Sequence, residues 1–174
     1  MLDPYDPETW HDFFLASAGA AAALTGLLFI GLSLHVRYIA SSSRHRNMAR
    51  GSLIGLVLVL VISLVALLPQ AESWAGGELV VVNLFYIVAV GGYQLSIYRR
   101  MNWVVPAASV LRQTLGLLLA AAGMFGGIGL YFHFGGGLYV VALQVVAIVI
   151  WNLQNAWLLL MGVADEDMAK ALKS

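Results

Sequence analysis

The stretch Gly137–Val163, GLYVVALQVVAIVIWNLQNAWLLLMGV, decides the fold, because it runs its whole length without a charged residue. An α-helix needs roughly 20 mostly apolar residues to cross about 30 Å of hydrocarbon, and this stretch is long enough. A strand of a transmembrane barrel is about half as long and alternates apolar with polar residues, which this stretch does not do. The stretch therefore predicts a membrane-spanning α-helix.

Four stretches before it have the same apolar character, and each is bounded by arginine or proline. The first is followed by Arg37, the second stops at Pro69, the third stops at Arg99, and the fourth begins after Arg112. The connections between them are too short to hold a further domain. We therefore predict an all-α chain, residues 1–174, that forms a single integral membrane domain. It is a five-helix transmembrane bundle with spans at about 13–36, 51–68, 78–98, 115–134 and 137–163.

Composition agrees with this prediction. Hydrophobic residues make up 61% of the chain, charged residues make up 10%, and the mean hydropathy is +0.86. A soluble domain is usually about 45–50% apolar and about 25% charged. These values exclude a water-soluble globular domain, a disordered tail and a nucleic-acid-binding protein. The absence of cysteine excludes a disulfide framework, a thiolate metal site and a cysteine nucleophile.

The nine lysines and arginines predict the orientation of the chain. They flank the first and third connections or lie in the C-terminal tail, which five spans place on one side of the membrane. By the positive-inside rule that side is cytoplasmic, so we expect the N-terminus outside and the C-terminus in the cytoplasm. The cytoplasmic basic cluster either sets the topology alone or also contacts anionic lipid headgroups or a partner. Its members are Arg44, Arg46, Arg50, Arg99 and Arg100.

Small residues gather in two of the predicted spans. Gly19, Ala23 and Gly26 lie in the first, while Gly123 and Gly127 form a GxxxG motif in the fourth. Small residues let helix backbones approach closely in a membrane, where lipid tails are as apolar as leucine. With the N-terminus outside, the two groups lie at the same depth on antiparallel helices. We therefore predict that they pack against each other near the outer leaflet.

Neutral amides are the informative polar residues within the spans. Gln144 and Asn155 of the fifth span are eleven positions apart, which places them within about 20° on a helix, and Asn152 lies about 80° away around it. Asn83 and Gln94 repeat that spacing in the third span. Two interpretations stay open. The amides form hydrogen bonds between helices, within one protomer or between protomers, or they line a hydrated pore or polar cavity.

Catalytic machinery is missing from the sequence. No Asp, Glu, Lys or Arg lies deep in a span, and no nucleophile–base pair, phosphate-binding loop or dinucleotide fingerprint is present. A metal site would have to combine His11, His133 and a carboxylate, and nothing in the spacing of these residues demands it. We therefore expect no enzyme, no cofactor and no metal.

The stretch Trp10–Leu34, WHDFFLASAGAAAALTGLLFIGLSL, resembles the opening of small, uncharacterised bacterial integral membrane proteins. The resemblance rests on the aromatic entry Trp10, Phe13 and Phe14 and on Gly19, Leu24, Gly26 and Leu27. It covers one span and implies no activity and no functional residue. What it implies is a location in the bacterial cytoplasmic membrane.

These observations favour a structural or accessory membrane protein that is homo-oligomeric and has no catalytic role. One alternative is a small oligomeric ion channel with the polar face of the fifth span lining its pore. Another is a carrier for a small neutral or lipidic solute. The expected surroundings are the lipid bilayer, other copies of the chain and anionic headgroups at the cytoplasmic face, with no nucleic acid. The sequence does not identify an ion, a solute, a protein partner or an oligomer number.

Overall fold

The computed structural model describes residues 4–41, 43–100 and 107–171, and the regular elements in these ranges are helical. A short 3₁₀ helix, η1 (Pro7–Trp10), leads directly into the first long helix. The helices that follow are α1 (His11–Leu34), α2 (Val36–Ser41), α3 (Ser43–Ala66), α4 (Glu72–Arg100), α5 (Ala107–Phe132) and α6 (Gly137–Ala171).

Five helices in the described part of the chain are long and apolar enough to cross a membrane. Their membrane-compatible segments are Pro7–Leu34, His45–Ala66, Glu72–Arg99, Gln113–Phe132 and Gly137–Leu158. The prediction of five spanning helices is thereby confirmed, and the chain is a multi-pass membrane protein.

Four helices are longer than the hydropathy pattern predicts. α3 begins at Ser43 instead of residue 51, α4 begins at Glu72 instead of residue 78, α5 begins at Ala107 instead of residue 115, and α6 continues past residue 163 to Ala171. Hydropathy marks where a chain leaves the hydrocarbon, whereas backbone hydrogen bonding continues into the interface. The acidic side chain of Glu72 in the first turn of α4 also suits the positive end of the helix dipole.

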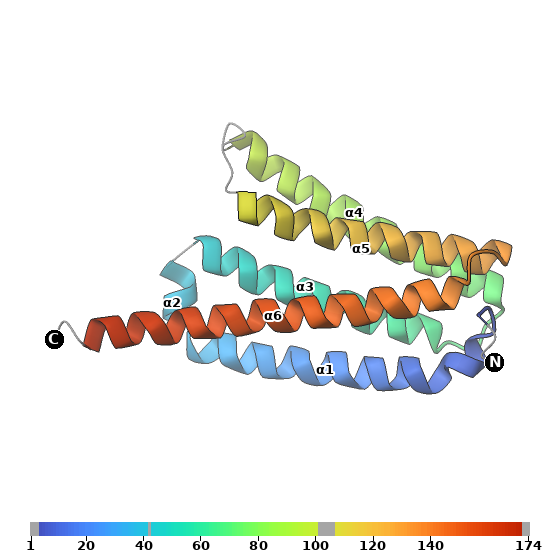
Figure 1. Ribbon diagram of the computed structural model, residues 1–174, viewed down its shortest axis with the longest axis horizontal. Coiled ribbons are helices and arrows are strands. Elements are labelled where there is room, and N and C mark those ends of the chain that lie inside the picture. Colours follow the sequence, from blue (N-terminus) through green and yellow to red (C-terminus); the bar gives the residue numbers. More distant parts are fainter. Residues whose placement is uncertain (1–3, 42, 101–106, 172–174) are drawn as a thin grey trace.

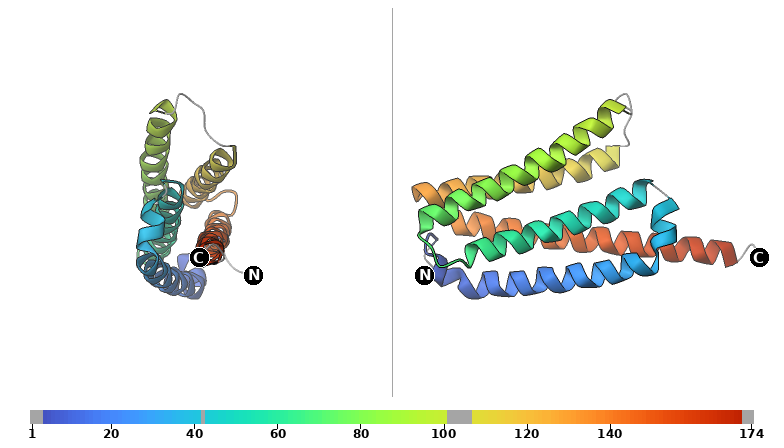
Figure 2. Two further views of the ribbon diagram at one scale, coloured as in Figure 1. Left: turned by 90° about the vertical axis from the view of Figure 1, so that its left-hand side faces the viewer. Right: turned by 180° about the vertical axis from the view of Figure 1, so that it is seen from behind.

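The helices form two antiparallel pairs that α6 joins. α1 packs on α3, α4 packs on α5, and α6 contacts both α3 and α5 (Figure 1). Toward the C-terminus of the chain the α4–α5 pair diverges from the α3–α6 pair, as both long-axis views show (Figures 1 and 2). α6 therefore packs against a helix of each pair, and α3 and α4 also meet directly.

The chain places its connections alternately at two ends of the fold. The N-terminus, the α3–α4 connection and the α5–α6 connection share one end, which we call the N-terminal end (Figure 1). α2, the beginning of α3, the last turn of α4 and the C-terminus share the other. We call this the cationic end, because it carries Arg46, Arg50 and Arg99. The alternation agrees with the predicted grouping of the cations.

Apolar packing is continuous near the N-terminal end. Trp10 and Phe14 from the start of the chain join Leu79 of α4, Leu130 of α5 and Leu138 of α6 in one buried cluster. Burial of large side chains from four helices fixes how the two helix pairs meet at this end.

The α5–α6 turn is bound to the N-terminal segment. The Leu138 backbone N–H donates to the Pro4 carbonyl over 3.0 Å, which satisfies a free donor in the first turn of α6. Gly135 and Gly136 both have φ of 67°, a left-handed conformation that glycine adopts without cost. His133 shares that conformation at φ 57°, which is unusual for a residue with a side chain.

Candidate functional site

The polar centre of the bundle is a hydrogen bond between Asn83 of α4 and Gln144 of α6. The Gln144 Nε2 donates to the Asn83 Oδ1 over 2.6 Å, and both side chains are fully buried. The Asn83 Nδ2 in turn donates to the Leu79 carbonyl over 2.9 Å, one turn back along α4. This bond links α6 directly to a helix of the α4–α5 pair, deep within the membrane-compatible region.

Gly123 of α5 leaves the space that the Gln144 amide occupies. A Cβ at Gly123 would occupy the same space as the amide oxygen, carbon and nitrogen of Gln144. The amide therefore lies flat against the α5 backbone while its nitrogen reaches Asn83. We call this arrangement of Asn83, Gly123 and Gln144 the upper amide contact.

Two buried polar atoms near this level have no hydrogen-bond partner among the described residues. They are the Gln144 Oε1 and the Ser63 Oγ of α3. The Gln144 Oε1 lies against the backbone of Gly123.

A second glycine–amide contact joins α6 to α3, closer to the cationic end. Asn152 is buried, and its Nδ2 donates to the Ile148 carbonyl over 2.8 Å. A Cβ at Gly55 would lie 2.8 Å from the Asn152 Oδ1, too close for any ordinary contact. We call Gly55 with Asn152 the lower amide contact. Since α3 and α6 are antiparallel, buried Asn155 of α6 lies at the level of buried Ser52 of α3.

Gln94 does not belong to either contact. It is buried on α4, with 8% of its surface exposed, and no hydrogen bond joins it to another side chain in the part of the chain described. The structure thus brings Asn83 together with Gln144, places Asn152 and Asn155 against α3, and leaves Gln94 apart. The eleven-residue spacing seen in the sequence marks buried helix faces without pairing Gln94 to the amides of α6.

The glycines of α5 pack against neighbouring helices of the same chain. Gly127 faces α4, where a Cβ would lie 2.9 Å from the Gly76 carbonyl oxygen and 3.1 Å from the Val80 nitrogen. Since these are backbone atoms, only glycine permits this approach. The GxxxG motif therefore serves two neighbours, with Gly123 facing α6 and Gly127 facing α4.

Gly19, Ala23 and Gly26 of α1 face outward, so the prediction that they pack against Gly123 and Gly127 is wrong within this chain. A Cβ at Gly19 or Gly26 would meet no atom within 4 Å, and Ala23 is exposed. The reason is that α1 rests on α3 with its opposite side. The buried residues of that side are Phe14, Ala18, Ala21 and Leu28.

Polar side chains at the N-terminal end surround an open groove of about 1010 Å³. Its clearest contact joins the His133 Nε2 and the Glu72 Oε2 over 2.6 Å, with both side chains partly exposed. Asp6, Asp12 and His11 also line the groove. Among the described residues no three His, Asp or Glu side chains gather closely enough to hold a metal ion.

At the cationic end two arginines of the predicted basic cluster have different partners. The Arg46 Nη1 donates to the Ala40 carbonyl of α2 over 3.2 Å. The Arg50 guanidinium carbon lies 4.7 Å from the centre of the Tyr93 ring on α4. Arg99 is exposed, and the side chains of Arg44 and Arg100 lie outside the described residues. The Arg50–Tyr93 contact has no signal in the sequence, because it joins residues on two helices through tertiary packing.

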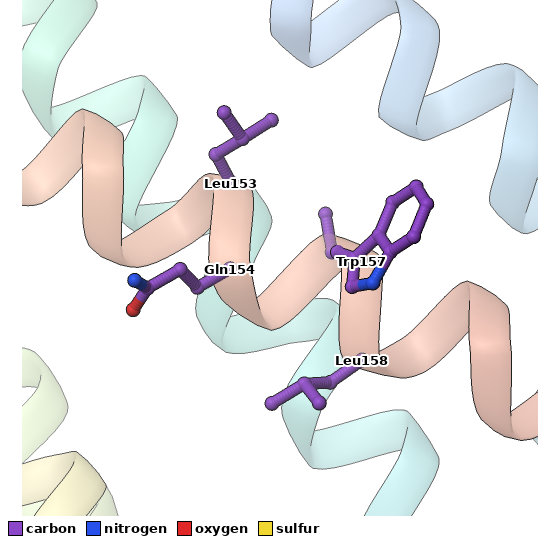
Figure 3. A pocket seen from close by; sticks show the side chains of 5 residues that line it. Leu153, Gln154, Trp157 and Leu158 are labelled. Carbon is purple, nitrogen blue, oxygen red and sulfur yellow. The ribbon is translucent and has the colours of Figure 1, made fainter.

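A shallow hollow of about 540 Å³ lies on the outer surface of α6 (Figure 3). Leu153 and Trp157 extend to one side of the helix, and Gln154 and Leu158 extend to the other. The walls come from α6 alone, so this hollow lacks the converging polar groups of a ligand site.

No protein-family model matches the chain, and neither a curated protein nor a solved structure matches it. The resemblance of Trp10–Leu34 to bacterial membrane proteins therefore stays a prediction. The length and composition of the helices show that the chain is a polytopic membrane protein. Five helices among its described residues are able to span the bilayer.

Proposed function

We propose that this protein is a structural or accessory component of the bacterial cytoplasmic membrane, without catalytic activity, that works as a homo-oligomer. The observation that carries the proposal is the upper amide contact. Its amides are fully buried within the spans, they bind each other, and the Gln144 amide lies against the α5 backbone. Polar groups used in this way stabilise helix association in membranes.

The upper and lower amide contacts together argue against the two transport alternatives. A pore or a carrier cavity needs polar groups that face water or a solute, but Gln144 and Asn152 are covered by helices of their own chain. Gly123 and Gly55 hold them there by close contact. The amides therefore support an interhelical role over a pore-lining one.

The outward face of α1 supports assembly between copies. Gly19, Ala23 and Gly26 are spaced along one side of the helix, and their exposed backbone would admit a second helix at short range. The proposal places the N-terminus outside and the cationic end in the cytoplasm, where anionic lipid headgroups would meet the arginines.

The absence of cysteine makes the assembly directly testable. A single Ala23→Cys substitution introduces a thiol on the outward face of α1, and Val81→Cys introduces one on the exposed surface of α4 as a matched control. Oxidation in native membranes should yield disulfide-linked dimers of the Ala23→Cys protein and few of the control. Disulfide formation requires Cα atoms closer than about 7 Å, and the Val81→Cys control measures the contribution of random collisions.

Two results would overturn the proposal. One is a strictly monomeric protein in lipid, with equal and low cross-linking of both cysteine variants. The other is ion or solute flux through protein-containing liposomes that Gln144→Leu and Asn152→Leu abolish, since that outcome would assign the amides to a transport path.

A further inference from the structure

Arg50 is held against Tyr93 at the boundary of the membrane. It lies near the start of the second membrane-compatible segment, and its guanidinium rests 4.7 Å from the centre of the Tyr93 ring. A guanidinium over an aromatic face is attracted to the ring and keeps its N–H donors available to an anion. Both residues are exposed, so these donors are open to the bilayer interface.

The guanidinium of Arg50 has no hydrogen-bond acceptor in the described part of the chain. The acidic side chains that the structure describes all belong to the N-terminal end, namely Asp6, Glu8, Asp12, Glu72 and Glu78. The side chains of Asp165, Glu166 and Asp167, near the end of α6, lie outside the described ones. No ion pair or hydrogen bond from the Arg50 guanidinium is found among the described residues. Arg46, one turn earlier on α3, differs because its guanidinium already donates to the Ala40 carbonyl.

The location indicates which anion would complete the contact. Arg50 lies near the start of α3, at the end that also carries Arg46 and Arg99. At this end the α4–α5 pair diverges from α3 and α6 (Figure 1). Phosphate groups of lipids occupy this depth, and two phosphate oxygens match the fork of an arginine. Neighbouring cations favour a headgroup with net negative charge over a zwitterionic one.

We propose that Arg50, supported by the Tyr93 ring, binds the phosphate of an anionic phospholipid at the α3–α4 edge of the cationic end. The site needs no second copy of the chain. It is therefore independent of the proposed assembly and is measurable on the monomer in detergent.

The test counts lipids bound to purified protein by native mass spectrometry, with phosphatidylglycerol and phosphatidylcholine as probes. We expect Arg50→Ala to weaken phosphatidylglycerol binding about tenfold, because charge-assisted hydrogen bonds are lost. Arg50→Lys keeps the charge without the fork, and Tyr93→Leu removes the ring, so each should weaken binding by about two- to fivefold. Tyr93→Phe keeps the ring and should bind like the unmodified protein.

Arg46→Ala is the matched control, since it removes one positive charge from the same turn region of α3. Binding should change less than twofold in that variant. Equal losses in Arg46→Ala and Arg50→Ala would overturn the proposal in favour of diffuse surface charge. Equal binding of phosphatidylcholine, or full competition by millimolar inorganic phosphate, would overturn the assignment to an anionic lipid. Arg50→Lys and Tyr93→Leu keep the test decisive if Arg50→Ala does not fold.

Discussion

α1 and α5 both carry stretches of small residues, yet the two helices use them in opposite ways. Gly123 and Gly127 of α5 are buried against α6 and α4, where a Cβ would collide with neighbouring atoms. Gly19 and Gly26 of α1 have open space around them. The same composition therefore provides close packing inside the chain in one helix and an unoccupied face in the other.

The difference shows that a small-residue motif specifies a possible close approach without specifying its partner. α5 follows α4 in an antiparallel pair and is also covered by α6, so both sides of its GxxxG motif are occupied. α1 lies at the edge of the fold and packs on α3 with the side opposite Gly19 and Gly26, where Phe14, Ala18, Ala21 and Leu28 are buried. Position in the bundle decides whether a glycine stabilises the monomer or remains available to another molecule.

The largest expected difference in stability is between two glycine-to-alanine substitutions, one at buried Gly127 of α5 and one at outward-facing Gly19 of α1. Gly127→Ala should lower the free energy of unfolding by about 1–3 kcal/mol, because the backbone of Gly76 and Val80 must move. Gly19→Ala should leave it unchanged or slightly raised, since alanine favours helix. Reversible unfolding in mixed micelles measures both. Equal destabilisation by the two substitutions would remove the distinction between the two helices.

A double-mutant cycle on Asn83 and Gln144 tests the polar part of the internal contact. Asn83→Leu and Gln144→Leu each leave one buried amide without its partner, so the paired substitution should cost less than the sum. We expect a coupling free energy of about 0.6–2 kcal/mol, the range found for hydrogen bonds between helices in membranes. Additive effects would mean that the 2.6 Å bond does not hold α4 to α6.

A smaller effect is expected at Gly123, where the obstacle is the end of a side chain. Gly123→Ala should cost about 1 kcal/mol, less than Gly127→Ala, because the Gln144 amide can rotate away. In a Gln144→Ala background the same substitution should cost little, since the colliding atoms are gone. Unfolding measurements on the four proteins decide this. An unchanged cost in that background would show that the amide is not what Gly123 accommodates.

The smallest effect is expected outside the membrane, at the contact between His133 and Glu72. Both side chains are partly exposed to water, so Glu72→Gln should change the free energy of unfolding by less than about 1 kcal/mol. Thermal unfolding at neutral pH measures the change. A loss as large as that of Gly127→Ala would mean that the α5–α6 turn, and not helix packing, controls stability.

Much of the fold was predictable because hydrophobicity acts locally. Long apolar runs without charge can only be helices that cross the bilayer, so the five spans followed from their length alone. Helix ends were less predictable, as α4 shows by starting at Glu72. The amides were recognisable as important because polar groups in hydrocarbon need partners, but Gln94 shows that spacing does not name the partner.

The sequence by itself determined that the chain is helical, how many helices can span a membrane and at which end the cations gather, since each follows from residue type and order along one helix. Only the tertiary structure decided that Gln144 reaches Asn83 over Gly123, that Asn152 rests on Gly55, and that α1 turns its glycines outward. These contacts depend on the relative rotation of neighbouring helices. That rotation is fixed by side chains packing together from all of them, so no single stretch of sequence contains it.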